Sequence, residues 1–200
     1  MKKVCILKGS PRAGGNTNAL LKPFVEELKE KGCECREFDL YRMDLKPCVA
    51  CRCCQKDWAV FGCPLKDDMQ KIFDAIRESE LLILATPIYS WFCTAPMKNV
   101  LDRMVYGMNK YYGEEKGPSL WEGKELALVI SCGYRPERGA DLFEEAMKRY
   151  CKHSRLFYRG MLAERHLGYQ TEFMDQEKEG HAREFACGLL ETGCKQDCRE

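Results

Sequence analysis

Short apolar segments alternate along this chain with segments whose apolar residues recur at helical spacing. The strand-like segments are residues 4–7, 35–40, 81–85, 126–130 and 156–162, and the helical periods cover residues 20–28, 69–76, 97–105, 142–150 and 182–190. The segment at 81–85 is apolar throughout, as expected of a central strand in a parallel sheet. This alternation predicts an open parallel sheet with helices on both faces and right-handed crossovers.

Length and composition favour a single domain. For 200 residues, area scaling predicts that roughly 70% of the unfolded surface becomes buried, which is enough for one core but cramped for two. We therefore expect residues 1–200 to form a single domain, with a cysteine-rich insertion at about residues 41–66, here called the cysteine loop. The 32 basic and 31 acidic residues give a net charge of +1, which indicates neither a nucleic-acid-binding face nor a strongly acidic electron carrier.

The apolar runs are short. None approaches the ~20 residues that span a bilayer, and the run at 4–7 is too short for the hydrophobic region of a signal peptide. We expect a cytoplasmic protein without a membrane segment. In such a chain, the 14 cysteines indicate metal binding, redox chemistry or buried thiols rather than a disulfide framework.

The first predicted strand leads into Gly-Ser-Pro-Arg-Ala-Gly-Gly-Asn-Thr-Asn at residues 9–18, here called the first loop. Its glycines allow close backbone approach, its hydroxyls, amides and Arg12 supply donors, and it enters a helix N-terminus, which favours an anion. It lacks the Gly-Lys-Ser/Thr ending of a triphosphate loop and the G-x-G-x-x-G spacing of a dinucleotide loop. The alternative is a polar strand-to-helix turn.

Two further loops are predicted at strand carboxyl ends, where open α/β sheets bind ligands. The second loop is Thr-Pro-Ile-Tyr-Ser-Trp-Phe at residues 86–92, and the third is Ser-Cys-Gly-Tyr at residues 131–134. Backbone amides of residues 88–91 would face a planar heterocycle, on which Tyr89 or Trp91 would stack. Taken alone, the second loop is better explained as an aromatic plug over the core.

Together these motifs resemble the flavodoxin-like flavoprotein reductases, the group of NADPH-dependent FMN reductases and iron–sulfur flavoproteins. The resemblance rests on residues 9–17, on Lys-Asp-Asp-Met at 66–69, on Thr-Pro-Ile-Tyr at 86–89 and on Lys-x-x-Leu-Asp-Arg at 98–103. It covers residues 1 to about 135. It implies a flavodoxin-like three-layer sandwich with a five-stranded parallel sheet in the order 2-1-3-4-5.

The resemblance also implies noncovalently bound FMN. The ribityl phosphate would be held by Ser10, Arg12, Asn16, Thr17 and Asn18. One edge of the isoalloxazine ring would be lined by Pro87, Ile88, Tyr89, Ser90 and Trp91, and its other side by Ser131, Cys132 and Gly133. No catalytic acid–base pair is expected, because the flavin itself carries the electrons.

The cysteine loop contains Cys48-x₂-Cys51-x₂-Cys54, followed after eight residues by Cys63-Pro64. This pattern resembles the ligation of a four-iron cluster in ferredoxins. The iron–sulfur flavoproteins carry a comparable motif here, with a shorter final gap. The alternatives are a [4Fe–4S] centre on these four cysteines, zinc, a disulfide, or free thiols over the flavin. Cys194 and Cys198 are interpreted as part of a frayed terminus.

The resulting functional prediction is an FMN-dependent oxidoreductase. NAD(P)H would be the donor, and a quinone-like or nitroaromatic small molecule or a protein would be the acceptor. The first alternative is an iron–sulfur flavoprotein that takes electrons from ferredoxin through a [4Fe–4S] centre. The others are a non-catalytic flavodoxin-type carrier and a thiol or metal redox sensor.

Other side chains receive simpler interpretations. The three scattered histidines, His153, His166 and His181, are interpreted as surface or structural residues, and residues 66–68 as a helix cap. Pro23 predicts a kink or a displaced start in the first helix. An association patch is predicted from four aromatic residues in a long connection, and with it a homodimer. These are Tyr106, Tyr111, Tyr112 and Trp121.

Overall fold

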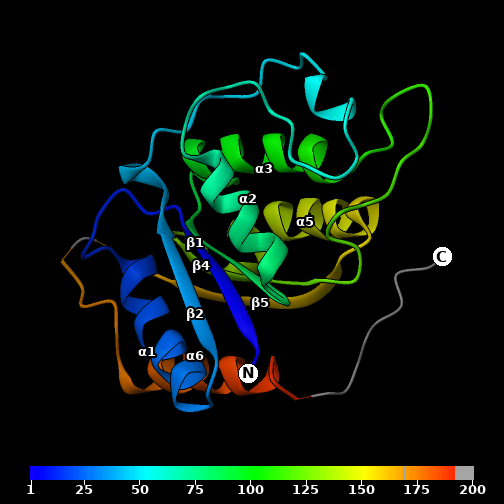
Figure 1. The fold of residues 1–200 in the computed structure, drawn as a ribbon. Helices are drawn as coiled ribbons and strands as arrows, with labels where there is room; N and C mark the ends of the chain where they lie inside the picture. The colour runs from blue at the N-terminus through cyan, green and yellow to red at the C-terminus, as the bar shows by residue number, and fades with distance from the viewer. Residues whose placement is uncertain (169, 192–200) are drawn as a thin grey trace.

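The computed structural model, which describes residues 1–168 and 170–191, contains a five-stranded sheet in the order β2-β1-β3-β4-β5 (Figure 1). All neighbouring strands are parallel, which confirms the predicted flavodoxin-like fold. The strands are β1 (Lys3–Lys8), β2 (Glu34–Asp39), β3 (Leu81–Pro87), β4 (Glu125–Cys132) and β5 (Phe157–Arg165).

Helices cover both faces of this sheet. On one side lie α1 (Asn16–Glu30) and α6 (Gln176–Gly188). On the other lie α2 (Met69–Glu78), α3 (Ala95–Met108) and α5 (Asp141–Ser154), with the short α4 (Pro136–Gly139) before α5. Two 3₁₀ turns, η1 (Leu40–Arg42) and η2 (Cys53–Gln55), lie in the connection between β2 and α2.

The two apolar cores follow from strand alternation. In β3, Leu82 and Leu84 belong to the core beneath α2, α3 and α5, whereas Leu81 and Ile83 face α1 and α6. All four are buried. An uninterrupted apolar run is therefore what a strand covered on both faces requires.

Some predicted helix ends differ in the structure. The helix α1 begins at Asn16 and continues through Pro23, whose ring is buried, so the expected displacement of its start does not occur. The helix α6 ends at Gly188, and Cys194 and Cys198, which are interpreted above as part of a frayed terminus, lie outside the described residues. Thr94 precedes α3 but does not cap it; its hydroxyl donates instead to the Gly9 carbonyl at 2.8 Å.

The aromatic connection before β4 is partly internal. Trp121 is 1% exposed and its indole donates to Asn109 Oδ1 at 2.8 Å, so its assignment to an association patch is wrong. The Tyr111 and Tyr112 hydroxyls both contact His153, at its carbonyl and its ring respectively. These aromatic residues therefore tie the connection to α5.

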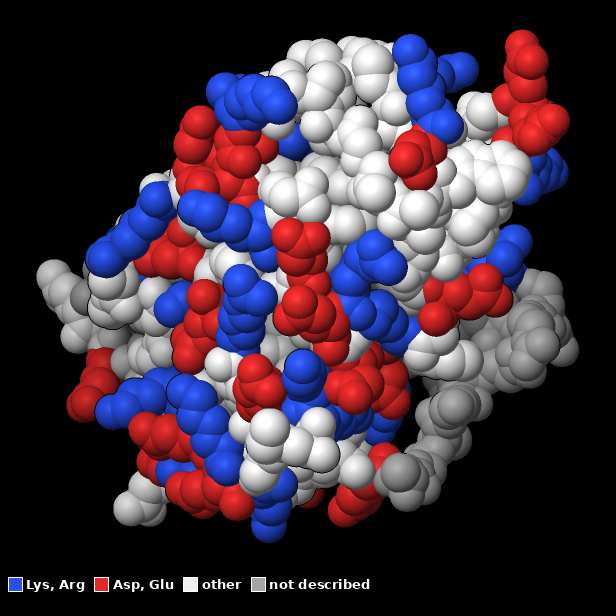
Figure 2. All heavy atoms as spheres, in the orientation of Figure 1, with Lys and Arg blue, Asp and Glu red and all other residues white. Residues whose placement is uncertain are grey.

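The surface charge is mixed. Figure 2 shows basic and acidic side chains interspersed over the face that carries α1 and β2, with a largely uncharged area towards the cysteine loop. Within the described residues, no helix combines the length and the apolar character needed to span a membrane.

Candidate functional site

A cavity opens at the carboxyl edge of the sheet, where the loops after β1, β3 and β4 emerge side by side. Its volume is about 360 Å³. It is lined by Arg12, Asn16, Pro87, Ile88, Tyr89, Ser131, Cys132, His166, Gly168 and Thr171. The three loops that the sequence singled out therefore contribute to one site.

The first loop curls into a cradle at the start of α1. Gly15 N and Ser10 Oγ both donate to the Arg12 carbonyl, at 3.0 and 3.2 Å. A Cβ at Gly15 would lie 3.1 Å from atoms of Ser10 and Arg12, so a side chain there would require these neighbours to shift by a few tenths of an ångström. Within the part of the chain that the structure describes, no side chain caps α1, and the first turn of this helix holds no acidic residue. The first-turn amides, which have no intrahelical acceptor, give this end a partial positive charge.

Hydrogen bonds join the loops. The hydroxyls of Thr17 and Ser131 are 2.7 Å apart and buried, so the first turn of α1 contacts the end of β4. The Ile88 amide donates to the Ser131 carbonyl at 2.9 Å, which connects the second and third loops. The cradle and the rest of the cavity are thus held in a fixed relation.

The second loop forms a tight turn. Tyr89 and Phe92 exchange backbone hydrogen bonds of 2.9 and 3.0 Å around Ser90 and Trp91, whose φ angles are +50° and +60°. Two consecutive positive φ angles are typical of a type I′ turn. The amides of Ile88 and Tyr89 are consequently bonded within the protein, which corrects the expectation that they face a ligand.

The turn places aromatic rings beside the cavity. Trp91 stacks on Tyr134 with a centroid distance of 6.0 Å and an interplanar angle of 10°. Its indole nitrogen donates to the Arg138 carbonyl at 3.2 Å. Ser90 and Trp91 therefore do not line the cavity; their turn follows the lining residue Tyr89.

Of the predicted cofactor residues, seven line the cavity: Arg12, Asn16, Pro87, Ile88, Tyr89, Ser131 and Cys132. Ser10 and Thr17 are buried within the first loop and α1. Asn18 instead lines a separate hollow between α1 and β2, and its amide donates to the carbonyls of Arg12 and Ala13 at 3.0 and 3.1 Å. Gly133 is adjacent to His166: a Cβ there would lie 3.3 Å from His166 Nε2.

Sequence reasoning missed the segment that follows β5. His166, Gly168 and Thr171 line the cavity, and the His166 amide donates to the Cys132 carbonyl at 2.9 Å. The interpretation of His166 as a surface or merely structural residue therefore overlooked its place. The rule that ligands bind at strand carboxyl ends would have indicated this segment had it been applied to the fifth strand.

Cys132 contributes a thiol to the cavity wall. Its Sγ donates to the Tyr134 carbonyl at 3.2 Å. Burial raises the pKa of this thiol to about 11. The side chain is therefore protonated at neutral pH, which is unfavourable for a nucleophile.

The residues present fit FMN. Arg12 and the first-turn amides of α1 form a donor set suited to a phosphate dianion. Next to them, the cavity between the second and third loops offers aromatic and apolar walls, as planar ligands require. A Cβ on Gly15 would lie 3.1 Å from the Arg12 carbonyl oxygen, the Arg12 Cβ and the Ser10 Oγ, so the first loop packs closely around this glycine.

The cysteine loop passes over α3 (Figure 1). Cys48, Cys51, Cys54 and Cys63 line one pocket there, together with Arg103 and Tyr106. The twelve cysteines of the described residues are free, and those residues include no group of three or more ligands arranged around a single metal ion.

The eight residues between Cys54 and Cys63 fold back, so that the two ends of this segment lie close together. Gly62, at φ +67°, lies against Cys54. A Cβ added to this glycine would be only 3.3 Å from the Cys54 Cα. The fully buried Lys110 donates to the carbonyls of Cys54 and Val60 at 2.7 Å each. The longer gap therefore does not separate Cys63 from Cys54.

The thiols of this loop differ in their electrostatics. Hydrogen bonds from the backbone and thiol of Cys53 hold the pKa of Cys51 below its ordinary value. Burial raises the pKa of Cys54. Four thiols around one pocket form a donor set that suits an iron–sulfur cluster.

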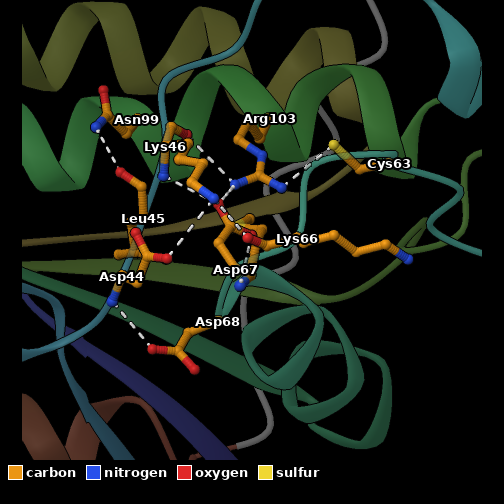
Figure 3. Close-up of polar contacts among 10 residues, drawn as sticks. Asp44, Leu45, Lys46, Cys63, Lys66, Asp67, Asp68, Asn99 and Arg103 are labelled. Carbon is orange, nitrogen blue, oxygen red and sulfur yellow. Dashed lines mark hydrogen bonds and ion pairs between the residues drawn. The ribbon is translucent and has the colours of Figure 1, made fainter.

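A buried ion pair lies beside these cysteines (Figure 3). Asp67 accepts from Arg103 Nη1, and Arg103 Nη2 donates to Cys63 Sγ at 3.2 Å. Asp67 Oδ1 accepts from the Met69 amide at 3.2 Å at the start of α2, as the helix-cap interpretation expects. The other oxygen, Oδ2, accepts from Arg103 instead. Burial would raise the Asp67 pKa, but the hydrogen bonds from Arg103 and from the amides of Lys46 and Met69 outweigh it and lower the pKa.

Solved structures with a similar fold include redox enzymes. An NAD(P)H:quinone oxidoreductase from Methanothermobacter marburgensis has a TM-score of 0.68 and 24% identity, covering 94% of this chain and 98% of that one. An FMN-dependent NADH-azoreductase from Bacillus anthracis, in complex with FMN, has a TM-score of 0.66 and 15% identity, covering 96% and 100%.

Curated relatives are more similar in sequence. An iron–sulfur flavoprotein of Archaeoglobus fulgidus is 37% identical over 151 residues, which are 75% of this chain and 64% of that protein. Another, from Methanocaldococcus jannaschii, is 33% identical over 101 residues, 50% of this chain and 51% of that one. The chain thus spans about half to two thirds of the length of these relatives.

The family model for NADPH-dependent FMN reductase matches residues 2–156. That range contains the first, second and third loops and the pocket of the cysteine loop. The chain belongs to the NADPH-dependent FMN reductase family.

Proposed function

We propose that this protein is an FMN-dependent oxidoreductase that accepts electrons from NAD(P)H and passes them to a small-molecule or protein acceptor. One observation carries the proposal: the uncapped N-terminus of α1 and the first loop open into a cavity bounded by the second and third loops. Family membership supports it, as does the FMN bound by the structurally similar azoreductase.

The first loop would hold the phosphate. Arg12 lines the cavity beside Asn16 at the start of α1, where a guanidinium and helix amides together favour a dianion. Ser10 keeps the loop curled through its bond to the Arg12 carbonyl. The Thr17–Ser131 contact then fixes this anchor relative to the end of β4.

The second and third loops would orient the ring. Bound FMN supplies reversible hydride and electron transfer. The protein supplies walls: Ile88 and Tyr89 from one loop, Cys132 from another, and His166 after β5. Because the Tyr89–Phe92 turn is closed by its own backbone hydrogen bonds, Tyr89 is held in place before any ligand binds.

Anaerobic reduction tests this proposal. Protein reconstituted with FMN is mixed with NADPH or NADH, and the flavin absorbance near ~450 nm is followed, a band that the cofactor itself imposes. We expect bleaching by at least one nucleotide and recovery on addition of a quinone or nitroaromatic acceptor. Failure of both nucleotides, with rapid reduction by ferredoxin, would overturn NAD(P)H as the donor. Failure to bind FMN would favour a thiol or metal sensor.

A second candidate function is favoured by the cysteine pocket. We propose that Cys48, Cys51, Cys54 and Cys63 hold a [4Fe–4S] centre through which ferredoxin delivers electrons. The common pocket of these four residues supports it, and so does the 37% identity to a protein named iron–sulfur flavoprotein. Anaerobic purification should yield about four iron and four sulfide per chain.

Cysteine variants make this test specific. Cys63→Ser should lose iron, whereas Cys35→Ser should keep it, because Cys35 lies on β2 outside the pocket. Iron absent from anaerobically purified wild type would refute the centre. Equal iron in both variants would refute the ligand assignment.

We also propose a homodimer and a cytoplasmic location. Tyr89, Trp91 and Tyr134 are about half exposed beside the cavity, and exposed aromatic residues of this kind favour contact with a second copy. The free thiols of the twelve cysteines within the described residues favour a reducing compartment. Sedimentation that shows only a monomer at micromolar concentration would contradict the dimer.

A further inference from the structure

Arg103 links two motifs that lie 36 residues apart, and it does so beneath the cysteine pocket. Its side chain is 2% exposed and that of Asp67 1% exposed. One end of the guanidinium contacts Asp67 and the Lys46 carbonyl, the latter at 3.3 Å. The other end donates from Nη2 to Cys63 Sγ at 3.2 Å (Figure 3).

The carboxylate fixes the direction of this ion pair. Asp67 accepts from the backbone amides of Lys46 and Met69 at 2.9 and 3.2 Å, so it is held independently of Arg103. The positive end of the pair consequently points to Cys63 and the negative end to the start of α2. A buried ion pair is a weak source of stability, because desolvation offsets its attraction, so its orientation calls for another explanation.

Arg103 has a donor left over. Its Nε is buried and has no hydrogen-bond partner among the described residues, although Arg103 lines the pocket formed by the four cysteines. A buried donor without an acceptor costs about 1–3 kcal/mol. A sulfur-rich anion in that pocket would give this donor an acceptor.

The described lining of the pocket carries positive charge. It contains Arg52 and Arg103 but no carboxylate. The buried Lys110 is bonded to the Cys54 carbonyl at 2.7 Å. The potential of an iron–sulfur cluster depends on net charge and on hydrogen bonds to its sulfur atoms. Arg103 supplies both to one ligand, Cys63.

We propose that Arg103, oriented by Asp67, raises the reduction potential of the iron–sulfur centre held by Cys48, Cys51, Cys54 and Cys63. This inference rests on the centre proposed above. Reduction adds one electron and therefore one negative charge to the cluster and its four thiolates, with no bond formed or broken. The guanidinium stabilises that added charge. Arg103 acts on the cluster through its hydrogen bond to Cys63, so it is a positioning residue and not a catalytic one.

The two partners predict shifts of opposite sign. Arg103→Gln removes the positive charge nearest Cys63 and should shift the midpoint potential to more negative values. Asp67→Asn removes the compensating negative charge and should shift it to more positive values. Arg103→Lys keeps the charge but loses the planar fork that reaches Asp67 and Cys63 together, so its potential should lie between those of wild type and Arg103→Gln.

An EPR-monitored redox titration with dithionite, under strict anaerobiosis, measures these shifts. Lys98→Gln is the matched control, since it removes an exposed cation from the same helix, where Lys98 pairs with Asp102; we expect no shift. The midpoint of bound FMN is a second reference, because its cavity and the cysteine pocket share no lining residue.

The outcomes separate the two proposals. Wild-type protein without iron and sulfide would overturn both the centre and this inference. An intact centre whose potential is the same in wild type and Arg103→Gln would overturn only the inference. Shifts of the same sign in Arg103→Gln and Asp67→Asn would do so too, because they indicate a purely structural role. Circular dichroism checks that each variant folds. If Arg103→Gln or Asp67→Asn does not fold, an Arg103→Lys protein whose midpoint potential equals that of wild type would overturn the inference.

Discussion

Thr17 Oγ1 and Ser131 Oγ lie 2.7 Å apart in the protein interior, one in the first turn of α1 and the other near the end of β4. The two residues are 114 positions apart. Through this contact, the helix end that would hold a phosphate is attached to the strand that would flank the flavin ring. This pair of hydroxyls is therefore one of the contacts that fix the geometry of the site.

Thr17→Val removes this hydrogen bond at nearly constant volume. The Ser131 hydroxyl would remain buried without its partner, and we expect the free energy of unfolding to fall by about 1–2 kcal/mol. Urea denaturation measures the change. Thr17→Ser retains the hydroxyl and should lose less than Thr17→Val. Equal stability of the valine variant and the wild type would contradict this interpretation.

Arg12→Ala should weaken FMN binding. A charge-assisted hydrogen bond contributes about 1.5–3 kcal/mol, so the Kd should rise roughly 10- to 100-fold. Fluorescence titration with FMN and with riboflavin measures the effect. Riboflavin has no phosphate and should bind both proteins equally. Lys22→Ala, which removes an exposed cation from α1, should leave both affinities unchanged; an unaffected FMN affinity in Arg12→Ala would refute the phosphate site.

The fold could be predicted closely from the sequence, because a strand that is buried on both faces of the sheet consists of an uninterrupted apolar run. Each predicted strand is present, but β5 runs over Phe157–Arg165 rather than residues 156–162. It lies at the sheet edge, where most of its residues are only half-buried. Polar residues are tolerated there, so the apolar run does not mark the end of the strand.

The site was predictable only in part. Loops at strand carboxyl ends could be found from composition and topology, and seven of the predicted residues line the cavity. The internal bonding of the Ile88 and Tyr89 amides depends on turn geometry that no residue pattern specifies. The Arg103–Asp67 pair joins α3 to the end of the loop that precedes α2, and a contact between distant positions leaves no signal in a single sequence.

The Ser90–Trp91 turn carries backbone strain that a substitution can relieve. Ser90 has φ +50°, a conformation that asparagine adopts more readily than serine in type I′ turns. Ser90→Asn should raise the free energy of unfolding by about 0.5–1 kcal/mol, whereas Ser90→Val should lower it, because a β-branched side chain resists positive φ. Chemical denaturation of both variants distinguishes a strained turn from an unstrained one, for which Ser90→Asn would have no effect.

Lys110→Met should loosen the cysteine loop. Burial lowers the pKa of Lys110, yet its ammonium group donates to the Cys54 and Val60 carbonyls. Without it, these acceptors lose their donor, and we expect a loss of about 1–3 kcal/mol in stability. Hydrogen exchange should accelerate across residues 54–63. Lys116→Met, an exposed position in the connection that follows Lys110, should leave exchange unchanged; similar exchange in both variants would contradict this role.

Acid should destabilise the protein partly through Asp67. Because the folded-state pKa of this carboxyl lies below its ordinary value, its contribution is complete above the unfolded pKa of about 3.9 and is lost as the pH falls through the folded pKa. Asp67→Asn has no such group, so its unfolding free energy should fall less steeply between about pH 5 and pH 2. Denaturation at several pH values measures the slopes. Asp102→Asn is the control: both Asp102 and its partner Lys98 are exposed, and solvent screens that pair, so the slope of this variant should stay near that of wild type. Identical slopes for wild type and Asp67→Asn would show that the buried pair does not govern the acid limb.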